Sequence, residues 1–465
     1  MYQKILLLTG IIIFFLSGCT LAPKYERPAA PVPNQWPTGA AYSPITAKEA
    51  AARIPWRDFI TDQRLQKVID TALNNNRDLR VAALNVDRAR ALYGIKRSEL
   101  LPTVDAVGSM SKGRTPADLT TNGFENTYEQ YSVNLGILSW EIDFFGRIRS
   151  LKDQAFEQFL ATDQARLSTR ILLISSVAGA YFTLAADREA LKLSISTLEA
   201  QEATYKLVRK RHEVGLASEL DLYRIQSQVD TARADVARYT QFVAQDENAL
   251  SLLIGSPVLQ SLEPVELASV SPPKDISPGL SSEILLNRPD VLAAEHTLKA
   301  ANANIGAARA AFFPRISLTT SIGTASASLS GLFKDGSSTW NFAPQIVMPI
   351  FDARTWYAYD VTKVDKEISI AQYEKAIQSA FREVADSLAV QGTVNRQIEA
   401  QQSLVNAFNQ TYRLSTARYM KGIDSYLGVL DAQRSLFSAQ QGLIGLRLIR
   451  LNNMIILYKA LGGGA

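Results

Sequence analysis

The chain has 465 residues, of which 20% are charged and 47% hydrophobic, so it is neither a disordered nor a collagen-like polymer. Its 49 Lys and Arg residues against 45 Asp and Glu residues leave a net charge of +4, which implies no polycationic surface for nucleic acid. Two histidines and one cysteine nearly exclude a zinc site, an iron–sulfur site and a disulfide scaffold, so we expect no metal and no bound cofactor.

The first 18 residues have the pattern of a lipoprotein signal peptide. Lys4 precedes an apolar run up to Leu16 that is shorter than the ~20 residues of a transmembrane helix. Leu-Ser-Gly then precedes Cys19, the only cysteine, and this resembles a bacterial lipobox, whose cysteine is lipidated. Thr20 stands where an aspartate would mark inner-membrane retention, which favours the outer membrane. We expect acyl chains to anchor an extended strap at 19–60, although an ordinary signal peptide containing a cysteine is the alternative.

The rest of the chain contains an internal sequence repeat. At a shift of 212 residues, and of 207 after the first hairpin, matching residues follow one another in the same order. Such pairs include Asp78 and Asp290, Gly94 and Gly306, Pro102 and Pro314, Phe144 and Phe351, Gly215 and Gly422, and Gly255 and Gly462. We therefore expect two structural repeats, at 61–255 and 281–465, separated by a proline-rich linker at 256–280.

Each repeat is predicted to begin with a helix and a β-hairpin. The helices, at about 65–100 and 282–312, end before a proline. The hairpins, at about 103–143 and 315–351, contain segments near ten residues long in which apolar and polar residues alternate. This length and pattern are typical of membrane-barrel strands, and a soluble sandwich hairpin is the alternative.

A long helical hairpin completes each repeat. From Arg147 to about Val214 there is no proline and little glycine, which predicts a helix on the order of 100 Å long. Gly215 and Gly422 mark the tips, after which a second helix returns. In the last helix, residues from Val429 onward recur every seven positions with small residues in a parallel row, which predicts coiled-coil packing.

The strands indicate how the chain meets the membrane. No apolar stretch of 18 or more residues follows Cys19, which argues against helical spans and leaves a closed β-barrel. Four strands cannot close, so chains must pool them; a dimer gives eight strands filled by side chains, whereas a trimer gives twelve and a lumen. Candidates for an aromatic girdle at the membrane interface are Tyr128, Tyr131, Trp340 and Phe342.

Several motifs together resemble the outer membrane factor family, the TolC-like exit ducts of tripartite efflux pumps, and within it the OprM-type lipoprotein branch. These motifs are Leu-Ser-Gly-Cys at 16–19, Glu-Ile-Asp-Phe-Phe-Gly-Arg at 141–147, Arg-Pro-Asp at 288–290, the Ala-Asn-Ala-Asn to Phe-Phe-Pro stretch at 301–314, Ser-Tyr-Leu at 425–427, Leu-Asp-Ala-Gln-Arg-Ser-Leu at 430–436 and Leu-Tyr-Lys-Ala-Leu-Gly-Gly-Gly at 457–464. The resemblance covers essentially the whole chain. It implies an α+β fold, in which a homotrimer forms a twelve-stranded membrane β-barrel continued by a periplasmic α-helical coiled-coil barrel.

The implied function is that of a passive exit duct in the outer membrane of a Gram-negative bacterium. Its implied partners are outer-membrane lipid, a periplasmic membrane-fusion adaptor and an inner-membrane transporter of the RND type, as in multidrug resistance. We expect no enzymatic activity, since no P-loop or G-x-S-x-G motif occurs. Alternatives are a duct for type I protein secretion and a non-transporting coiled-coil lipoprotein of the envelope. The sequence leaves the exported substrate open among drugs, solvents and metal ions.

Two candidate sites lie at the helical tips. The resemblance implies that the turns contact the adaptor through Val214, Gly215, Leu216, Gly422 and Ile423.

The second candidate site is an aperture gate just after the Gly422 turn. Leu427 and Asp431 share a helical face and match positions that constrict related ducts. A threefold ring would make an apolar plug and an anionic ring, with Asp424 as a second acidic ring. The alternative for Asp431 is a solvated helix carboxylate or an ion pair with Arg434.

Overall fold

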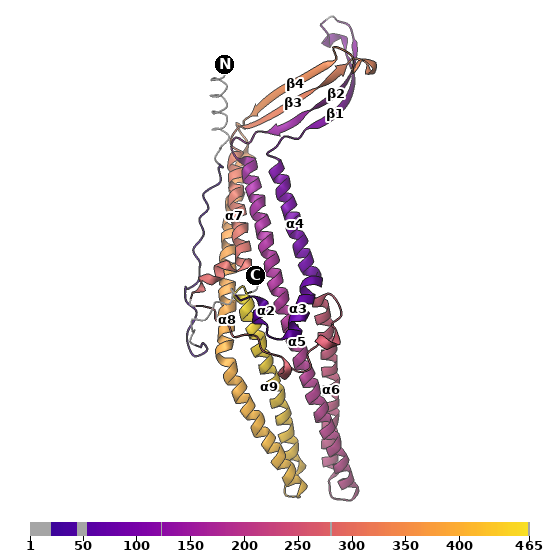
Figure 1. The fold of residues 1–465 in the computed structure, drawn as a ribbon, viewed down its shortest axis with the longest axis vertical. Coiled ribbons are helices and arrows are strands. Elements are labelled where there is room, and N and C mark those ends of the chain that lie inside the picture. The colour runs from indigo at the N-terminus through magenta and orange to yellow at the C-terminus, as the bar shows by residue number, and fades with distance from the viewer. Residues whose placement is uncertain (1–19, 44–53, 122, 280, 464–465) are drawn as a thin grey trace. The chain divides into compact units, whose positions relative to one another are not determined.

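A computed structural model of the chain describes residues 20–43, 54–121, 123–279 and 281–463. Most of the regular structure in these residues is helical, and the remainder is one four-stranded sheet (Figure 1). The helices and strands in chain order are α2 (Trp56–Phe59), α3 (Gln63–Asn75), α4 (Arg77–Ser98), β1 (Asp105–Thr115), β2 (Asn126–Glu141), α5 (Arg147–Glu213), α6 (Glu219–Ile254), α7 (Pro289–Ala310), β3 (Arg315–Ser326), β4 (Ser338–Val347), α8 (Ala353–Met420) and α9 (Tyr426–Ala460).

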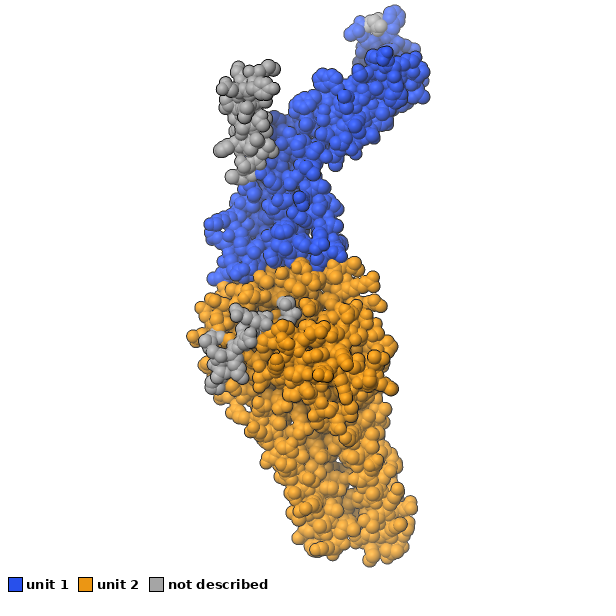
Figure 2. Space-filling model, in the orientation of Figure 1, with its two compact units in different colours: residues 1–29, 85–162, 293–373 blue, residues 30–84, 163–292, 374–465 orange. Residues whose placement is uncertain are grey.

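The chain forms two compact units, and each unit takes chain from both repeats (Figure 2). Unit 1 consists of the described parts of 1–29, 85–162 and 293–373, and unit 2 of the described parts of 30–84, 163–292 and 374–465. Unit 1 contains the sheet and α7 from residue 293 onward, and unit 2 contains both helical tips. The compact units therefore do not follow the sequence repeats, because each unit packs segments of both copies together.

The sheet of unit 1 is antiparallel, in the order β1-β2-β3-β4. The two hairpins lie within the predicted ranges and are joined by pairing of β2 with β3, where Leu135 lies opposite Ile322. The register places Tyr131, Val133 and Leu135 on one face and Ser132 and Asn134 on the other, as their alternation in the sequence predicts. One face of the sheet is therefore mainly apolar and the other mainly polar.

The helix that opens each repeat is broken, which corrects the prediction of continuous helices over 65–100 and 282–312. In the first copy, α3 ends before Asn76 and α4 starts after it. The Asn76 side chain accepts a hydrogen bond from the backbone N–H of Leu79 and donates to the carbonyl of Leu253. In the second copy, a short 3₁₀ helix (Ser282–Asn287) precedes Arg288, and α7 follows. The side chains at 76 and 288 make contacts that an uninterrupted helix would not offer, and periodicity alone does not reveal them.

The long helical hairpins agree with the predicted boundaries to within two residues. α5 has 67 residues and α8 has 68, so each is about 100 Å long. In α9, Val429, Leu443 and Leu457 are buried, as are Ala432 and Ala439 of the parallel row. The spacing of seven therefore marks a packed face, as predicted.

Among the described residues, one helix contains a stretch that is long and apolar enough to cross a membrane, which corrects the statement that none follows Cys19. This stretch lies in α5 (Arg147–Glu213), and 56% of it is buried inside the structure. Ile174, Val177, Ala178 and Phe182 are among its buried side chains. A stretch covered to this extent by the chain's own side chains is typical of a packed core helix.

Arg288 ties three segments of unit 2 together. Its guanidinium donates two hydrogen bonds to Asp290, one of 3.1 Å to Glu383 of α8 and one of 2.5 Å to the carbonyl of Ala460 at the end of α9. Only 7% of its side chain is exposed. Although burial disfavours the Asp290 carboxylate, the contacts with Arg288 lower its pKa overall.

We predict that Arg288→Met lowers the thermal midpoint of unfolding by several degrees, equivalent to about 2 kcal/mol, because charged hydrogen bonds are lost and acceptors are left unpaired. Circular dichroism of the purified protein measures this midpoint. Arg354→Met is the matched control, since the Arg354 side chain is 93% exposed and its ion pair with Asp352 is solvated. Equal midpoints for the two variants would contradict the role of Arg288.

Candidate functional site

Both helical hairpins reverse through a glycine in the left-handed conformation. Gly215 has φ +74° and Gly422 has φ +71°, which residues with a Cβ rarely adopt. After Gly215, the N–H of Leu216 donates to the carbonyl of Arg211 at 2.7 Å, and Ile423 after Gly422 makes the equivalent bond at 3.0 Å. Together with the bonds made by the glycine N–H groups, this closes both helices by the same Schellman motif.

The turns leave apolar side chains in solvent. Val214 and Leu216 are each 69% exposed at the first tip, and Ile423 is 58% exposed at the second. Exposed apolar groups at the ends of long helices favour contact with another protein. The structure thus places all five residues predicted for the tips in the two turns, with their side chains uncovered by this chain.

An aromatic cluster behind the turns joins the two hairpins. Its buried members are Val208, Ile225, Tyr419, Tyr426, Val429 and Leu430. The rings of Tyr419 and Tyr426 meet edge to face at 5.2 Å, and the Arg211 guanidinium lies 5.1 Å from the Tyr419 ring centroid. Sequence reasoning missed this cluster. The signal was available, because the first copy has His212 and Glu219 where the second has the two tyrosines.

The residues predicted for the aperture gate lie on α9 beside this cluster. Leu427 is 50% exposed, and Asp431, one turn further on, is exposed as well. The alternative ion pair of Asp431 with Arg434 is not formed, since the Arg434 Nε donates instead to Gln228 of α6 at 3.0 Å. Leu427 and Asp431 therefore share an uncovered face of α9.

Asp424 behaves differently from Asp431. Both of its carboxylate oxygens accept hydrogen bonds from Arg418, at 2.5 and 3.1 Å, across the Gly422 turn. The guanidinium holds the pKa of Asp424 below its usual range. Within this chain, Asp424 is therefore a charge neutralised by its partner, which weakens its case as an open acidic ring.

The strand register shows that the four residues predicted for the aromatic girdle do not all lie on one face of the sheet. Tyr131 and Trp340 lie on the mainly apolar face, and Phe342 lies two residues beyond Trp340 on that same face. Tyr128 is three residues from Tyr131, an odd number, so it points to the mainly polar face, where its ring covers Gly113. Three of the four residues lie on the mainly apolar face, and Tyr128 does not.

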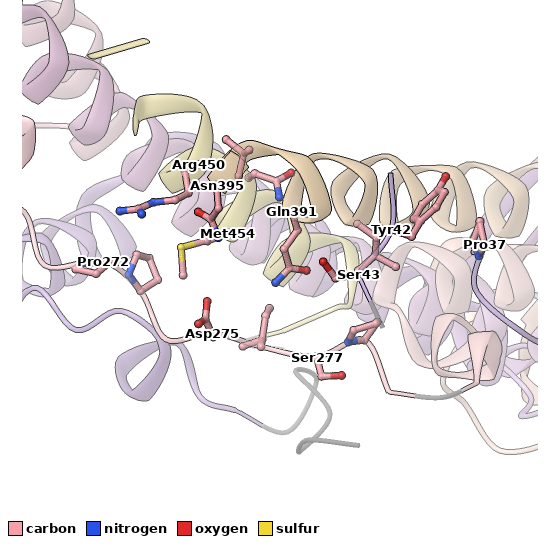
Figure 3. A pocket seen from close by; sticks show the side chains of 16 residues that line it. Pro37, Tyr42, Ser43, Pro272, Asp275, Ser277, Gln391, Asn395, Arg450 and Met454 are labelled. Atoms are coloured by element: carbon pink, nitrogen blue, oxygen red, sulfur yellow. The ribbon is translucent and has the colours of Figure 1, made fainter. Parts of the chain in front are cut away.

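Unit 2 contains a cavity of about 450 Å³ that no sequence motif indicated (Figure 3). The linker from Pro272 to Pro278 forms one wall, α8 and α9 form another, and Tyr42 of the strap lies beside them. Arg450 and Met454 of α9 line it. None of the residues predicted for the tips or the gate belongs to it.

Two carboxyl groups meet between the long helices of the first copy. Asp187 of α5 and Asp246 of α6 lie close enough to interact, and the Oδ2 atom of Asp246 is buried without a hydrogen-bond partner. Burial, together with this neighbour, raises the pKa of Asp246 to about 7. Both carboxyl groups therefore favour the protonated form more than a solvated aspartate does, because the pKa of each is raised mainly by burial.

The last two sequence predictions concern the lipidation site and metal binding. The predicted lipidation site, Cys19, lies outside the described residues. Among the residues that are described, no group of three or more His, Cys, Asp or Glu side chains is placed to hold a metal ion.

A family model described as "Outer membrane efflux protein" matches residues 68–256 and 280–463. The chain is 50% identical over 464 residues to the toluene efflux pump outer membrane protein TtgC of Pseudomonas putida, covering 99% of this chain and 96% of that protein. It is equally similar, with the same coverage, to the antibiotic efflux pump outer membrane protein ArpC of Pseudomonas putida.

Solved structures share the fold. A membrane protein from Pseudomonas aeruginosa superposes with a TM-score of 0.90 at 40% identity, covering 96% of this chain and 98% of that chain. The open state of the MtrE outer membrane channel of Neisseria gonorrhoeae has a TM-score of 0.86 at 38% identity, again over 96% and 98% of the two chains.

We predict that Asp246→Asn flattens the decline of stability between about pH 4 and 7. The raised pKa means that the folded protein keeps a proton that the unfolded chain loses above about pH 4. The stabilising contribution of this carboxyl is therefore fully present below that pH and is lost as the pH rises through the pKa of the folded carboxyl. Thermal midpoints measured from pH 4 to 8 test this. Asp230→Asn, an exposed site on the same helix, is the control and should keep the wild-type slope.

Proposed function

We propose that three copies of this chain share one pore. The chain belongs to the family of outer membrane efflux proteins and has the fold of trimeric outer membrane factor channels. It is therefore an outer-membrane efflux channel. The observation that carries the proposal is the open sheet. β1 pairs only with β2, and β4 only with β3, so each chain has two unpaired edges among its described residues. In lipid, unpaired backbone groups are costly, and pairing β1 with β4 of a neighbouring copy removes every edge.

Apolar stripes in unit 1 support the same arrangement. On α8, Tyr357, Val361, Val364 and Ile368 follow one another at helical spacing and are 49–72% exposed. α8 follows the edge strand β4, and α4, which precedes the other edge strand β1, exposes its own apolar side chains, including Leu92 and Ile95. Closing the sheet between copies would bring these two faces into reach of each other and cover them.

The two faces of the sheet fit a water-filled barrel. Twelve strands leave a lumen, which the mainly polar face with Ser132 and Asn134 would line. The mainly apolar face would meet lipid, with Tyr131, Trp340 and Phe342 as its aromatic girdle. On the polar face, Tyr128 would point towards the lumen.

We further propose that the tips dock a periplasmic adaptor, which links the channel to an inner-membrane transporter of the RND type. The exposed apolar side chains of Val214, Leu216 and Ile423 support this assignment, because they lie on two turns that are closed by the same pattern of backbone hydrogen bonds. Gly215 and Gly422 allow a partner backbone to approach closely.

The gate is proposed to consist of Leu427 and Asp431. Three copies of an exposed leucine would form an apolar constriction, and three copies of an exposed aspartate an anionic ring. Asp424 is the weaker candidate, since Arg418 already pairs with it.

The membrane anchor is proposed to be a lipid on Cys19. The mass of the mature N-terminus, compared between wild type and Cys19→Ser, tests this directly.

The relatives named for toluene and antibiotic efflux support organic solvents and drugs as the exported class. Deleting the gene and measuring susceptibility to antibiotics, toluene and metal ions distinguishes these classes. Sensitivity to metal ions alone would overturn the assignment.

We predict that Leu427→Ala combined with Asp431→Ala makes the channel leakier, with single-channel conductance in planar bilayers rising severalfold, because both rings are removed. The wild-type protein should conduct weakly and run as a heat-resistant trimer. Leu404→Ala combined with Asp386→Ala, exposed residues of α8, is the matched control. Unchanged conductance would overturn the gate, and a wild-type monomer that does not conduct would overturn the channel.

We also predict that Leu216→Ser and Ile423→Ser each weaken adaptor binding by roughly tenfold, because each removes apolar area from the contact. Binding of the purified adaptor to the channel in detergent measures this. Leu252→Ser is the control, since Leu252 is 80% exposed but lies far along α6 from the tip. Equal binding by all three variants would contradict the tip assignment.

A further inference from the structure

Helix α7 carries a row of side chains that contacts the N-terminal strap. In chain order this row consists of Glu295, Lys299, Asn302, Gly306 and Arg309. The steps of four, three, four and three residues place all five on one face of the helix. The row ends close to the C-terminus of α7, next to the sheet in sequence.

The extended strap lies along this row in the opposite direction. The Arg309 guanidinium donates to the carbonyl of Leu21 at 3.2 Å, and the Asn302 amide donates to that of Pro23 at 2.8 Å. Between them, a Cβ added to Gly306 would come within 2.6 Å of the backbone nitrogen of Ala22, so only a glycine leaves room for the strap there.

The first turns of α7 hold the other end of this segment. The Arg27 guanidinium donates two hydrogen bonds to Glu295, at 3.1 and 2.6 Å, and the Tyr25 hydroxyl donates one of 3.2 Å. Lys299 contacts the same carboxylate at 3.1 Å, and its ammonium lies 5.3 Å from the centroid of the Tyr25 ring. Glu295 thus meets two cations and one hydroxyl, two of the three from the strap.

The lengths of the two partners agree. Fourteen helical steps from Glu295 to Arg309 cover about 21 Å at the usual rise. Six extended residues from Leu21 to Arg27 cover about 20 Å. The strap and the helix face therefore stay in register over the whole contact, without slack in either.

Burial makes Glu295 the residue on which this contact depends. Only 2% of its side chain is exposed, whereas the Arg27 side chain is 47% exposed. A buried carboxylate without partners is strongly unfavourable, so loss of the strap would leave Glu295 with Lys299 alone. Burial works against the charged form, but the hydrogen bonds from Arg27 and Lys299 lower the pKa of Glu295 overall.

We propose that this face of α7 is a docking site for an extended cationic segment, the chain's own strap, and that Glu295 is the positioning residue that holds it through Arg27. If Cys19 carries a lipid, as proposed above, only Thr20 separates it from Leu21, so at most about 7 Å of backbone joins the lipid-bearing residue to the docked strap. The docking site would then set the height at which the anchor leaves the protein. A tether of this length couples the lipid to α7 and not merely to a flexible tail.

A second contact holds the strap independently in unit 2. Trp36 is 4% exposed, stacks on Phe381 and donates to the carbonyl of Gly279. Ser282 donates from its backbone and its hydroxyl to the carbonyls of Asn34 and Pro33. A change at Glu295 should therefore release 21–27 and leave the segment around Trp36 in place.

Limited trypsin digestion of the full-length acylated protein in detergent tests this. Lys24 is followed by Tyr25 and is a cleavage site, whereas Arg27 is followed by Pro28 and is not. We expect Glu295→Gln to raise the rate of cleavage after Lys24 by ~10-fold or more, because cleavage follows the population of the open segment. Glu283→Gln, an exposed carboxylate early in the second repeat, is the matched control and should be cleaved at the wild-type rate.

Arg27→Ala serves as the second variant, since it alters only the strap and leaves α7 intact. It should reproduce the effect of Glu295→Gln, and the double variant should be cleaved no faster than either single variant, because both remove one interaction. Wild-type cleavage rates in both single variants, with trimers intact, would overturn the proposal. So would additive effects in the double variant.

The outcome is separable from that of the channel proposal. Conductance of the wild-type protein tests the channel, and it does not depend on the strap. Cleavage after Lys24 tests the docking site, and it is read by mass spectrometry whether or not the pore conducts. An unlipidated Cys19→Ser protein should show the same difference between wild type and Glu295→Gln if docking is a property of α7.

Discussion

A hydrogen bond from a side chain to a main-chain carbonyl recurs in both repeats, and it joins the break near the start of the repeat to the end of the helix that returns from the tip. Asn76 donates to the carbonyl of Leu253, and Arg288 donates to that of Ala460. These positions correspond under the two repeat shifts, because 288 − 76 = 212 and 460 − 253 = 207. α6 has 36 residues and α9 has 35, so each tip lies about 53 Å along its helix from the hydrogen bond at the end of that helix. A partner that must engage both tips at once requires such equal reach.

The two copies share a scaffold and differ where function is proposed. Their turns are closed by the same pair of backbone bonds, yet only the second copy places tyrosines at 419 and 426 and an acidic partner for Arg418 at 424. The first copy has Ala217 at the position of Asp424 and caps its returning helix with Ser218. The residues proposed for the gate all belong to the second copy. The two copies thus have matching hairpins, and the residues proposed for the gate occur in only one of them.

Unit 1 shows how much of a membrane channel is left unsatisfied in a single chain. Among its described residues, the sheet has two unpaired edges, the apolar face of the sheet is exposed, and the helices expose apolar stripes. The strap is an exception, since α7 provides it with hydrogen-bond donors from Asn302 and Arg309 and with the buried carboxylate of Glu295. Other copies and lipid can provide the strand partners and the apolar contacts that the isolated chain lacks. The position of the strap, in contrast, is set by contacts within the chain.

The sequence by itself determined the repeat, the four strands, the long hairpins and the two glycine turns, because each of these rests on local periodicity or on backbone conformation. It also placed Leu427 and Asp431 on one face, since helical spacing is a local property. It could not determine the break at Asn76, the face on which Tyr128 lies, or the partner of Asp424. These depend on which segments meet across the fold: a carbonyl 177 residues away, a strand register, and an arginine on the other side of a turn. The docking of the strap on Glu295, 268 residues from Arg27, is likewise a decision of tertiary structure, because a buried charge is tolerated only where distant donors converge on it.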